Sequence, residues 1–172
     1  LCEHLRVGMA AVRAMPAVNF FIATPGARAT ICALALREGI ESEFVRTALQ
    51  AFPVPPPVWA DEHWPWAMSL RCFGGFRADG LSAEGRGASK ASNKPINLLM
   101  LVAAHGVHGV PVALAADALW PGQDGDQAEN ALSVTLLRLR RMHAEADLVE
   151  RRGGWLHLNP QRVWTDVMAL ET

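Results

Sequence analysis

The chain of 172 residues is long enough for one ordinary domain or two small ones. Apolar residues make up 51% of it and charged residues 19%, a balance that supports a hydrophobic core and excludes wholesale disorder. No apolar run reaches the ~18 residues of a membrane-spanning helix, so we expect no membrane partner. The formal net charge of −1 neither favours nor excludes nucleic acid, because phosphates need positive charge locally rather than in total.

The beginning of the chain and its cysteines indicate a reducing compartment. Glu3, His4 and Arg6 interrupt the first residues, which lack the layout of a signal peptide. The three cysteines form no CxxC pair, so we expect buried free thiols in a cytoplasmic protein. Because the chain starts without Met and without a recognisable leader, we expect it to be a fragment of a longer protein.

Residues 1–52 are predicted to form a small all-α segment. Apolar residues recur at three- and four-residue spacing over 1–15, which predicts a first helix. A Thr-Pro-Gly turn then precedes a second helix predicted at 27–38. Ser42 is predicted to cap a third, short helix. Three short helices of this kind are typical of the tail of a helical-repeat array.

Residues 53–67 are predicted to be a linker. Four prolines between 53 and 57 forbid both a helix and a central strand. Trp59, Trp64 and Trp66 follow, and rings of this size are expected to lie against folded structure rather than in solvent. We therefore expect an extended but docked segment.

Residues 68–172 are predicted to form one α+β domain. Strand-like segments at its start are followed by two helical patterns, and then by the longest helical pattern of the chain. A hairpin around a glycine turn comes next. Strands, three helices and a hairpin are the element order of a winged helix-turn-helix. The predicted segments are strands at 70–73 and 76–78, helices opened by Pro95 and by Val110-Pro111, a helix at 126–146 and a hairpin at 148–158.

The longest helix, 126–146, is predicted to have one buried and one exposed face. Asp126 and Glu129 fit a capping box at its start. A stripe of leucines at three- and four-residue spacing predicts the buried face, and polar and basic residues fall opposite it. The stripe is Leu132, Leu136 and Leu139, and the opposite face is Asn130, Val134, Arg138 and Arg141.

The stretch from Leu70 to Leu158 resembles the winged-helix output domain of OmpR/PhoB-type response regulators. The resemblance is carried by the Ala-Leu-Trp-Pro sequence at 118–121, the leucine- and arginine-rich run at 132–141, and Arg-Gly-Gly at 152–154. The larger layout is similar to the C-terminal end of long LuxR/MalT-like ATP-dependent activators, in which helical repeats precede such a domain. The Trp-Pro-Trp sequence at 64–66 and the segment 34–41 support this likeness.

The resemblance implies that helix 126–146 enters the major groove of double-stranded DNA, while hairpin 148–158 contacts the backbone or the minor groove. Arg138 would contact guanine, and the hairpin arginines would contact phosphate. Arg140 lies nearer the leucine stripe, where pairing with an acid is the alternative. The sequence departs from the family pattern at Leu137, where relatives often carry a basic or polar residue, and at His143, where an apolar residue would close the stripe. The implied DNA-binding residues are Asn130, Val134, Thr135, Arg138, Arg140, Arg141, Arg151 and Arg152.

Other chemistries find little support in the residues. His105 and His108 flank glycines and have no evident third ligand, so loop histidines are favoured over a metal site. The acids at 124–129 lack the spacing of a calcium loop. No nucleotide-binding or hydrolase motif is present, so we expect no enzyme activity, cofactor or metal. The predicted function is a DNA-binding transcriptional regulator. The alternative is a winged helix used for dimerisation or for docking onto other domains of the parent protein.

Overall fold

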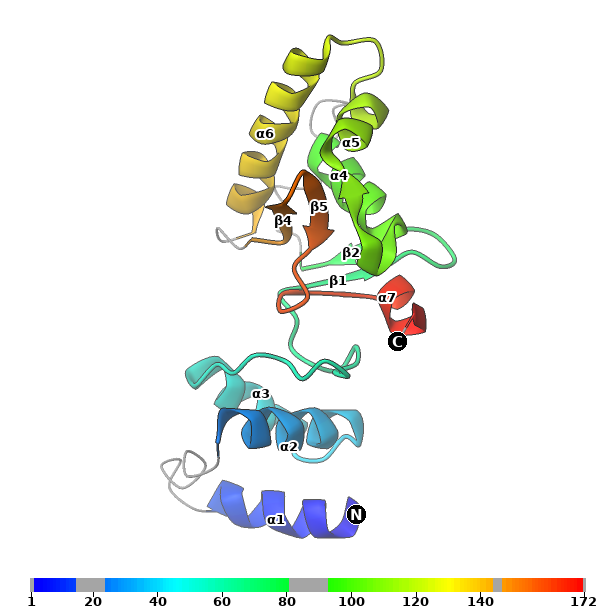
Figure 1. The fold of residues 1–172 in the computed structure, drawn as a ribbon. Coiled ribbons are helices and arrows are strands. Elements are labelled where there is room, and N and C mark those ends of the chain that lie inside the picture. The colour runs from blue at the N-terminus through cyan, green and yellow to red at the C-terminus, as the bar shows by residue number, and fades with distance from the viewer. Residues whose placement is uncertain (1, 15–23, 81–92, 144–146, 172) are drawn as a thin grey trace. The chain divides into compact units, whose positions relative to one another are not determined.

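The computed structural model describes residues 2–14, 24–80, 93–143 and 147–171 (Figure 1). The chain divides into two compact units, Leu1–Pro65 and Trp66–Thr172. The segment predicted as a linker, 53–67, contains no helix or strand, and most of it belongs to the first unit. Within that unit the guanidinium of Arg37 lies 5.8 Å from the ring centre of Trp59, so the segment is held against a helix by a cation–π contact.

The first unit contains three helices, α1 (Cys2–Ala14), α2 (Pro25–Arg37) and α3 (Ser42–Ala51). The Thr24 hydroxyl caps α2 by accepting a hydrogen bond from the Ala27 amide. At the other end Gly39 has φ of +67°, the left-handed conformation that often ends a helix. The prediction that Ser42 caps α3 is wrong. The cap is Glu41, also left-handed at φ of +48°, and Ser42 is the first residue of the helix.

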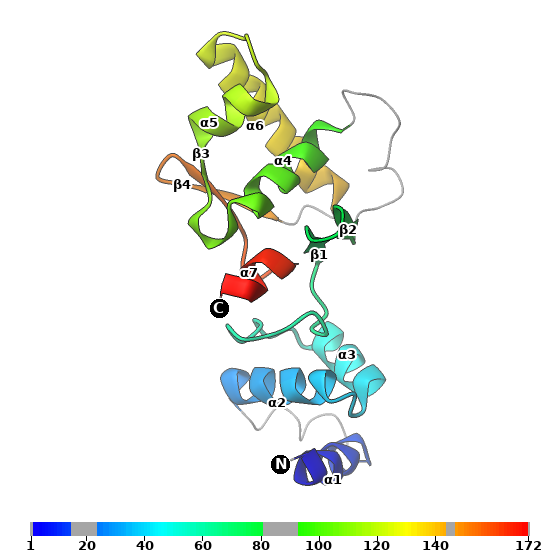
Figure 2. The ribbon, with the colours of Figure 1, turned by 90° about the vertical axis from the view of Figure 1, so that its right-hand side faces the viewer.

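The second unit mixes helices and strands, as the predicted α+β class requires. Its elements follow one another in the order strand pair, helix, short strand, two helices, hairpin, strand and short helix (Figures 1 and 2). Their bounds are β1 (Met68–Arg71), β2 (Arg77–Asp79), α4 (Lys94–Ala104), the 3-10 turn η3 (Gly106–His108), β3 (Val110–Pro111), α5 (Val112–Leu119), α6 (Gly125–Met142), β4 (Val149–Arg152), β5 (Trp155–Leu158), β6 (Val163–Thr165) and α7 (Asp166–Glu171).

One sheet has the strand order β3-β5-β4 and is antiparallel throughout. Val110 of β3 pairs with Leu156 of β5, so the short strand between α4 and α5 is joined to the C-terminal hairpin. The hairpin turn consists of Gly153 and Gly154, with φ of +56° and +82°. A two-residue turn with both φ values positive matches the right-handed twist of the strands, and glycine adopts it without strain. The predicted hairpin is therefore confirmed.

The other sheet has the order β2-β1-β6. The strand pair at its start was predicted, but β6 and α7 were not. Strand β6 lies parallel to β1, and α7 begins directly after it. The Asp166 carboxylate at the start of α7 accepts hydrogen bonds from the amides of Cys72 (2.8 and 2.9 Å) and Phe73 (3.1 Å). The Glu171 carboxylate at its other end accepts one from the amide of Val107 (3.0 Å). These bonds tie the C-terminal segment to the loop after β1 and to η3.

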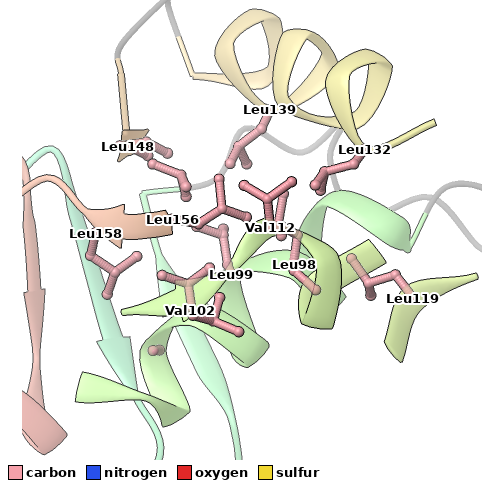
Figure 3. Packing of buried hydrophobic residues seen from close by; sticks show 14 of the residues in the cluster. Leu98, Leu99, Val102, Val112, Leu119, Leu132, Leu139, Leu148, Leu156 and Leu158 are labelled. Atoms are coloured by element: carbon pink, nitrogen blue, oxygen red, sulfur yellow. The ribbon is translucent and has the colours of Figure 1, made fainter. Parts of the chain in front are cut away.

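The core of the second unit lies between α4, α5, α6 and the β3-β5-β4 sheet (Figure 3), and buried residues of β1 and β6 extend it. Leu132 and Leu139 of α6 point toward Leu98 and Leu99 of α4 and toward Leu156 of β5, and all five are at most 1% exposed. Burial of one such side chain stabilises the fold by roughly 1.5–3 kcal/mol. The apolar stripe of α6 therefore fixes which face of this helix remains in solvent.

Candidate nucleic-acid interface

Helix α6 is 18 residues long and begins earlier than predicted. The Asp124 carboxylate caps it by accepting a hydrogen bond from the Gly125 amide at 2.9 Å. The prediction of a capping box between Asp126 and Glu129 is wrong, because Asp126 already lies inside the first turn and Glu129 binds elsewhere. An acidic residue in the first turn still interacts favourably with the positive end of the helix dipole.

The C-terminal end of α6 gives His143 a structural role. The helix ends at Met142, so the predicted end at 146 is too late, and residues 144–146 lie outside the described part of the chain. His143 follows as the C-cap, and its Nε2 donates a hydrogen bond to the Ala67 carbonyl at 2.6 Å. A polar ring at 143 therefore ties the end of the helix to the backbone just before β1, where an apolar residue could not.

The exposed face of α6 carries four of the predicted residues. Asn130, Val134, Arg138 and Arg141 are all exposed, as expected from their position opposite the buried stripe. Leu137 shares this face and is 46% exposed, next to Val134 at 55%. At about 100° per residue Leu137 falls between Asn130 and Ser133, so the helical period alone could have placed it there. It was not among the predicted site residues.

Thr135 is a predicted site residue that the structure removes from the interface. It is 4% exposed, and its hydroxyl donates to the Ala131 carbonyl of the same helix at 2.9 Å. At about 100° per residue Thr135 lies only ~40° from Leu139, so it belongs to the buried face. Leu136, predicted to be part of the stripe, is half-buried and packs against the core. The fully buried positions of α6 are Ala128, Leu132, Thr135 and Leu139.

Arg151 and Arg152 lie on strand β4, and both are exposed but engaged with carboxylates. Arg151 forms an ion pair with Glu129 of α6 at 2.5 Å, which links the hairpin to the helix. Arg152 pairs with Glu150 on its own strand. The side chains of Arg151 and Glu129 are 42% and 50% exposed, so the pair contributes no more than about 0.2–1 kcal/mol. An arginine in such a weak pair can leave its carboxylate and bind a phosphate instead.

Arg140 pairs with an acid, which was the alternative to DNA contact at this position. Its guanidinium forms an ion pair with Asp147, just before β4. On α6 it lies about 100° from Arg141, away from the exposed face described above. Arg140 therefore lies on the side of α6 that faces the start of the hairpin, and not on the face that carries Arg138 and Arg141.

The charges of α6 and the hairpin are balanced in total. Between Asp124 and Arg152 the described residues include five arginines (138, 140, 141, 151 and 152) and five carboxylates (Asp124, Asp126, Glu129, Asp147 and Glu150), and three of these carboxylates pair with arginines. Among the residues that the structure describes, Arg138 and Arg141 form no ion pair. The positive charge available to a partner is thus concentrated on the exposed face of α6.

His105, Cys32 and Cys72 lie outside this region and offer no metal site among the described residues. The His105 Nδ1 donates to the Leu101 carbonyl at 2.8 Å, and no group of three potential metal ligands occurs in the described ranges. Burial raises the pKa of the Cys32 thiol to about 11, so it stays protonated and unreactive at neutral pH. Burial and the neighbouring Asp166 carboxylate also raise the pKa of Cys72.

Comparison of the chain with protein-family models, with curated proteins and with solved structures found no match. Within the part of the chain described, no helix has the length and apolar character needed to cross a membrane.

Proposed function

We propose that the second unit is a winged helix-turn-helix that binds double-stranded DNA. Its supporting feature is the element order α4-β3-α5-α6-β4-β5 together with the strand order β3-β5-β4. In this reading α6 is the helix that enters the major groove, and hairpin β4–β5 is the wing. The resemblance to the output domain of OmpR/PhoB-type regulators and to the end of LuxR/MalT-like activators belongs to the same proposal, as does a role in transcriptional regulation.

The observation that carries the proposal is the exposed face of α6. A solvent-facing stripe with two arginines that have no carboxylate partner among the described residues lies opposite the face of α6 that packs into the core. The wing adds two exposed arginines held only by weak surface pairs. Arginine is the side chain that contacts both guanine edges and phosphates most effectively. Arg138 contacts a base, Arg141 a base or phosphate, and Arg151 and Arg152 the backbone.

The test is binding of the full 172-residue chain to a labelled mixed-sequence duplex, followed by fluorescence anisotropy at several salt concentrations. The double variant Arg138→Ala/Arg141→Ala should bind more weakly and show a flatter dependence on salt, because two cationic contacts are lost. The matched control is Arg6→Ala/Arg46→Ala, which removes the same charge from exposed positions on α1 and α3. Equal affinities for the two double variants would contradict the proposal.

A second candidate function is contact with another protein. It is favoured by the exposed apolar side chains of Val134 and Leu137, which lie on the same face as the arginines. Sedimentation equilibrium distinguishes the two functions. A concentration-dependent dimer that Leu137→Asp disrupts, in a chain that binds no duplex, would support protein contact over DNA binding.

A further inference from the structure

The exposed face of α6 is apolar as well as basic. Val134 and Leu137 are 55% and 46% exposed, although both are side chains that proteins usually bury. They lie three residues apart and therefore on the same side of the helix, flanked by Arg138 and Arg141. We infer that Val134 and Leu137 contact the methyl groups of thymines, and that the preferred duplex carries thymines on neighbouring base pairs. This inference rests on the proposed DNA-binding function.

The chemistry of the major groove supplies the reason. Its base edges present hydrogen-bond donors and acceptors, and the C5-methyl of thymine is the apolar group among them. A leucine or valine placed against a guanine or cytosine edge would cover polar groups without giving them a hydrogen-bond partner, which is unfavourable. When the same side chain packs against a thymine methyl, apolar surface of both the side chain and the methyl group is buried. The two residues therefore discriminate between bases, whereas a phosphate-contacting arginine does not.

The spacing of the two side chains fits adjacent base pairs. Three residues along an α-helix correspond to a rise of about 4.5 Å. Successive base pairs in a duplex are about 3.4 Å apart. A helix running along the groove thus brings Val134 and Leu137 to two base pairs in succession, with Arg138 beside them for a guanine.

The flanking charge argues against a second copy of the chain as the occupant. A two-fold contact centred on Val134 and Leu137 would desolvate Arg138 and Arg141 of both copies. Desolvation of a charge opposes association unless a partner compensates it, and within the described residues no carboxylate pairs with either arginine. A polyanion with apolar groups in its groove satisfies both the arginines and the two apolar side chains.

The experiment begins with duplexes selected by the full chain from a random-sequence pool. Each thymine of the recovered duplex is then replaced, one at a time, by deoxyuridine, which removes the methyl and leaves base pairing unchanged. Loss of one buried methyl should weaken binding about fourfold. We expect this loss at two neighbouring positions and not elsewhere.

Variants assign the two methyls to side chains. Leu137→Ala should bind with equal affinity to two duplexes that differ only by thymine or deoxyuridine at one of the two sensitive positions. Val134→Ala should do the same at the other position. Both positions are exposed and alanine is a strong helix former, so the fold is retained. Leu170→Ala is the matched control, since Leu170 is 78% exposed on α7 and should leave the fourfold difference intact.

The possible outcomes separate this inference from the function on which it rests. Salt-dependent binding with equal affinity for thymine and deoxyuridine at every position would overturn the inference and leave DNA binding in place. Absence of binding to any duplex would overturn both. A loss of self-association in Leu137→Ala, without any change in duplex affinity, would assign the apolar residues to a contact between copies and also overturn the inference.

Discussion

Replacing Glu129 by Gln should strengthen DNA binding, because Glu129 holds the wing residue Arg151 in an ion pair. For Arg151 to contact a phosphate it must first leave this carboxylate. The pair is about half exposed, so breaking it costs about 0.2–1 kcal/mol. Glu129→Gln removes that cost, and affinity for duplex should rise by a factor of about 1.5 to 5.

The salt dependence should change together with the affinity. Each neutralised phosphate contributes ~0.9 to the slope of log K against log salt. In the unmodified chain the charge of Arg151 is already compensated by Glu129, so its phosphate contact adds little to this slope. Freeing Arg151 should steepen the slope by a further ~0.9. Anisotropy titrations of a mixed-sequence duplex at four or more salt concentrations measure both quantities.

A matched control separates this local effect from a general change in charge. Glu43→Gln makes the same chemical change on an exposed residue of α3, in the other unit. It should leave the slope as it is. Weaker binding by Glu129→Gln would refute the reasoning, because it would mean that the ion pair positions the wing for DNA rather than competing with it.

Three further predictions concern stability. Leu139→Ala should lower the unfolding free energy of the second unit by about 2–5 kcal/mol in urea denaturation, because Leu139 is 1% exposed in the core; a loss below ~1 kcal/mol would contradict this packing. Asp166→Ala leaves the amides of Cys72 and Phe73 without their acceptor and should cost about 1–3 kcal/mol, measurable in the same assay, whereas an unchanged midpoint would show that the C-terminal segment is not held there. The pKa of Cys32 is raised from 9.0 to about 11, so its contribution to the unfolding free energy is complete below pH 9 and falls by roughly 2–3 kcal/mol as the pH rises to 11. The unfolding free energies of wild type and Cys32→Ala should therefore converge over this pH range. A difference that stays constant between pH 9 and 11 would be the contrary result.

The helices and the hairpin could be predicted because each carries a strong local signal. The Gly153-Gly154 turn specifies the hairpin, and Gly39 marks the end of α2, whereas the predicted start at 27 is two residues later than the observed start at Pro25. For α6 the period of the leucines identified the buried side. These signals depend on residues close together in sequence, which is why they needed no knowledge of the tertiary structure.

The parts that were missed depend on distant contacts. Strand β6 is three residues long and forms by pairing in parallel with β1, nearly the whole domain away in sequence. Glu129 was assigned to a capping box because its spacing fits one, but its partner is Arg151 on the hairpin. For Arg140 pairing with an acid was an alternative from the start, but the sequence did not identify Asp147 as the partner. Ion pairs between surface residues leave no periodic signal.

Thr135 was wrongly included among the site residues, although the helical period already contained the answer. It was assigned to DNA only by the resemblance to the winged-helix family, yet its position on the helix places it beside Leu139. Its hydroxyl is satisfied by the Ala131 carbonyl, so a threonine can be buried in a helix without an unpaired group. The angular position on the helix is thus a better guide to exposure here than the resemblance.

The most direct test of DNA binding by α6 is a ¹H–¹⁵N chemical-shift titration of the full chain with a selected duplex. The account predicts that the largest changes fall on the amides and arginine side-chain groups of 130–141 and on the hairpin around Arg151 and Arg152, with α2 unaffected. Changes confined to α1–α3, or a spectrum in which α6 is unaltered at saturating duplex, would contradict it.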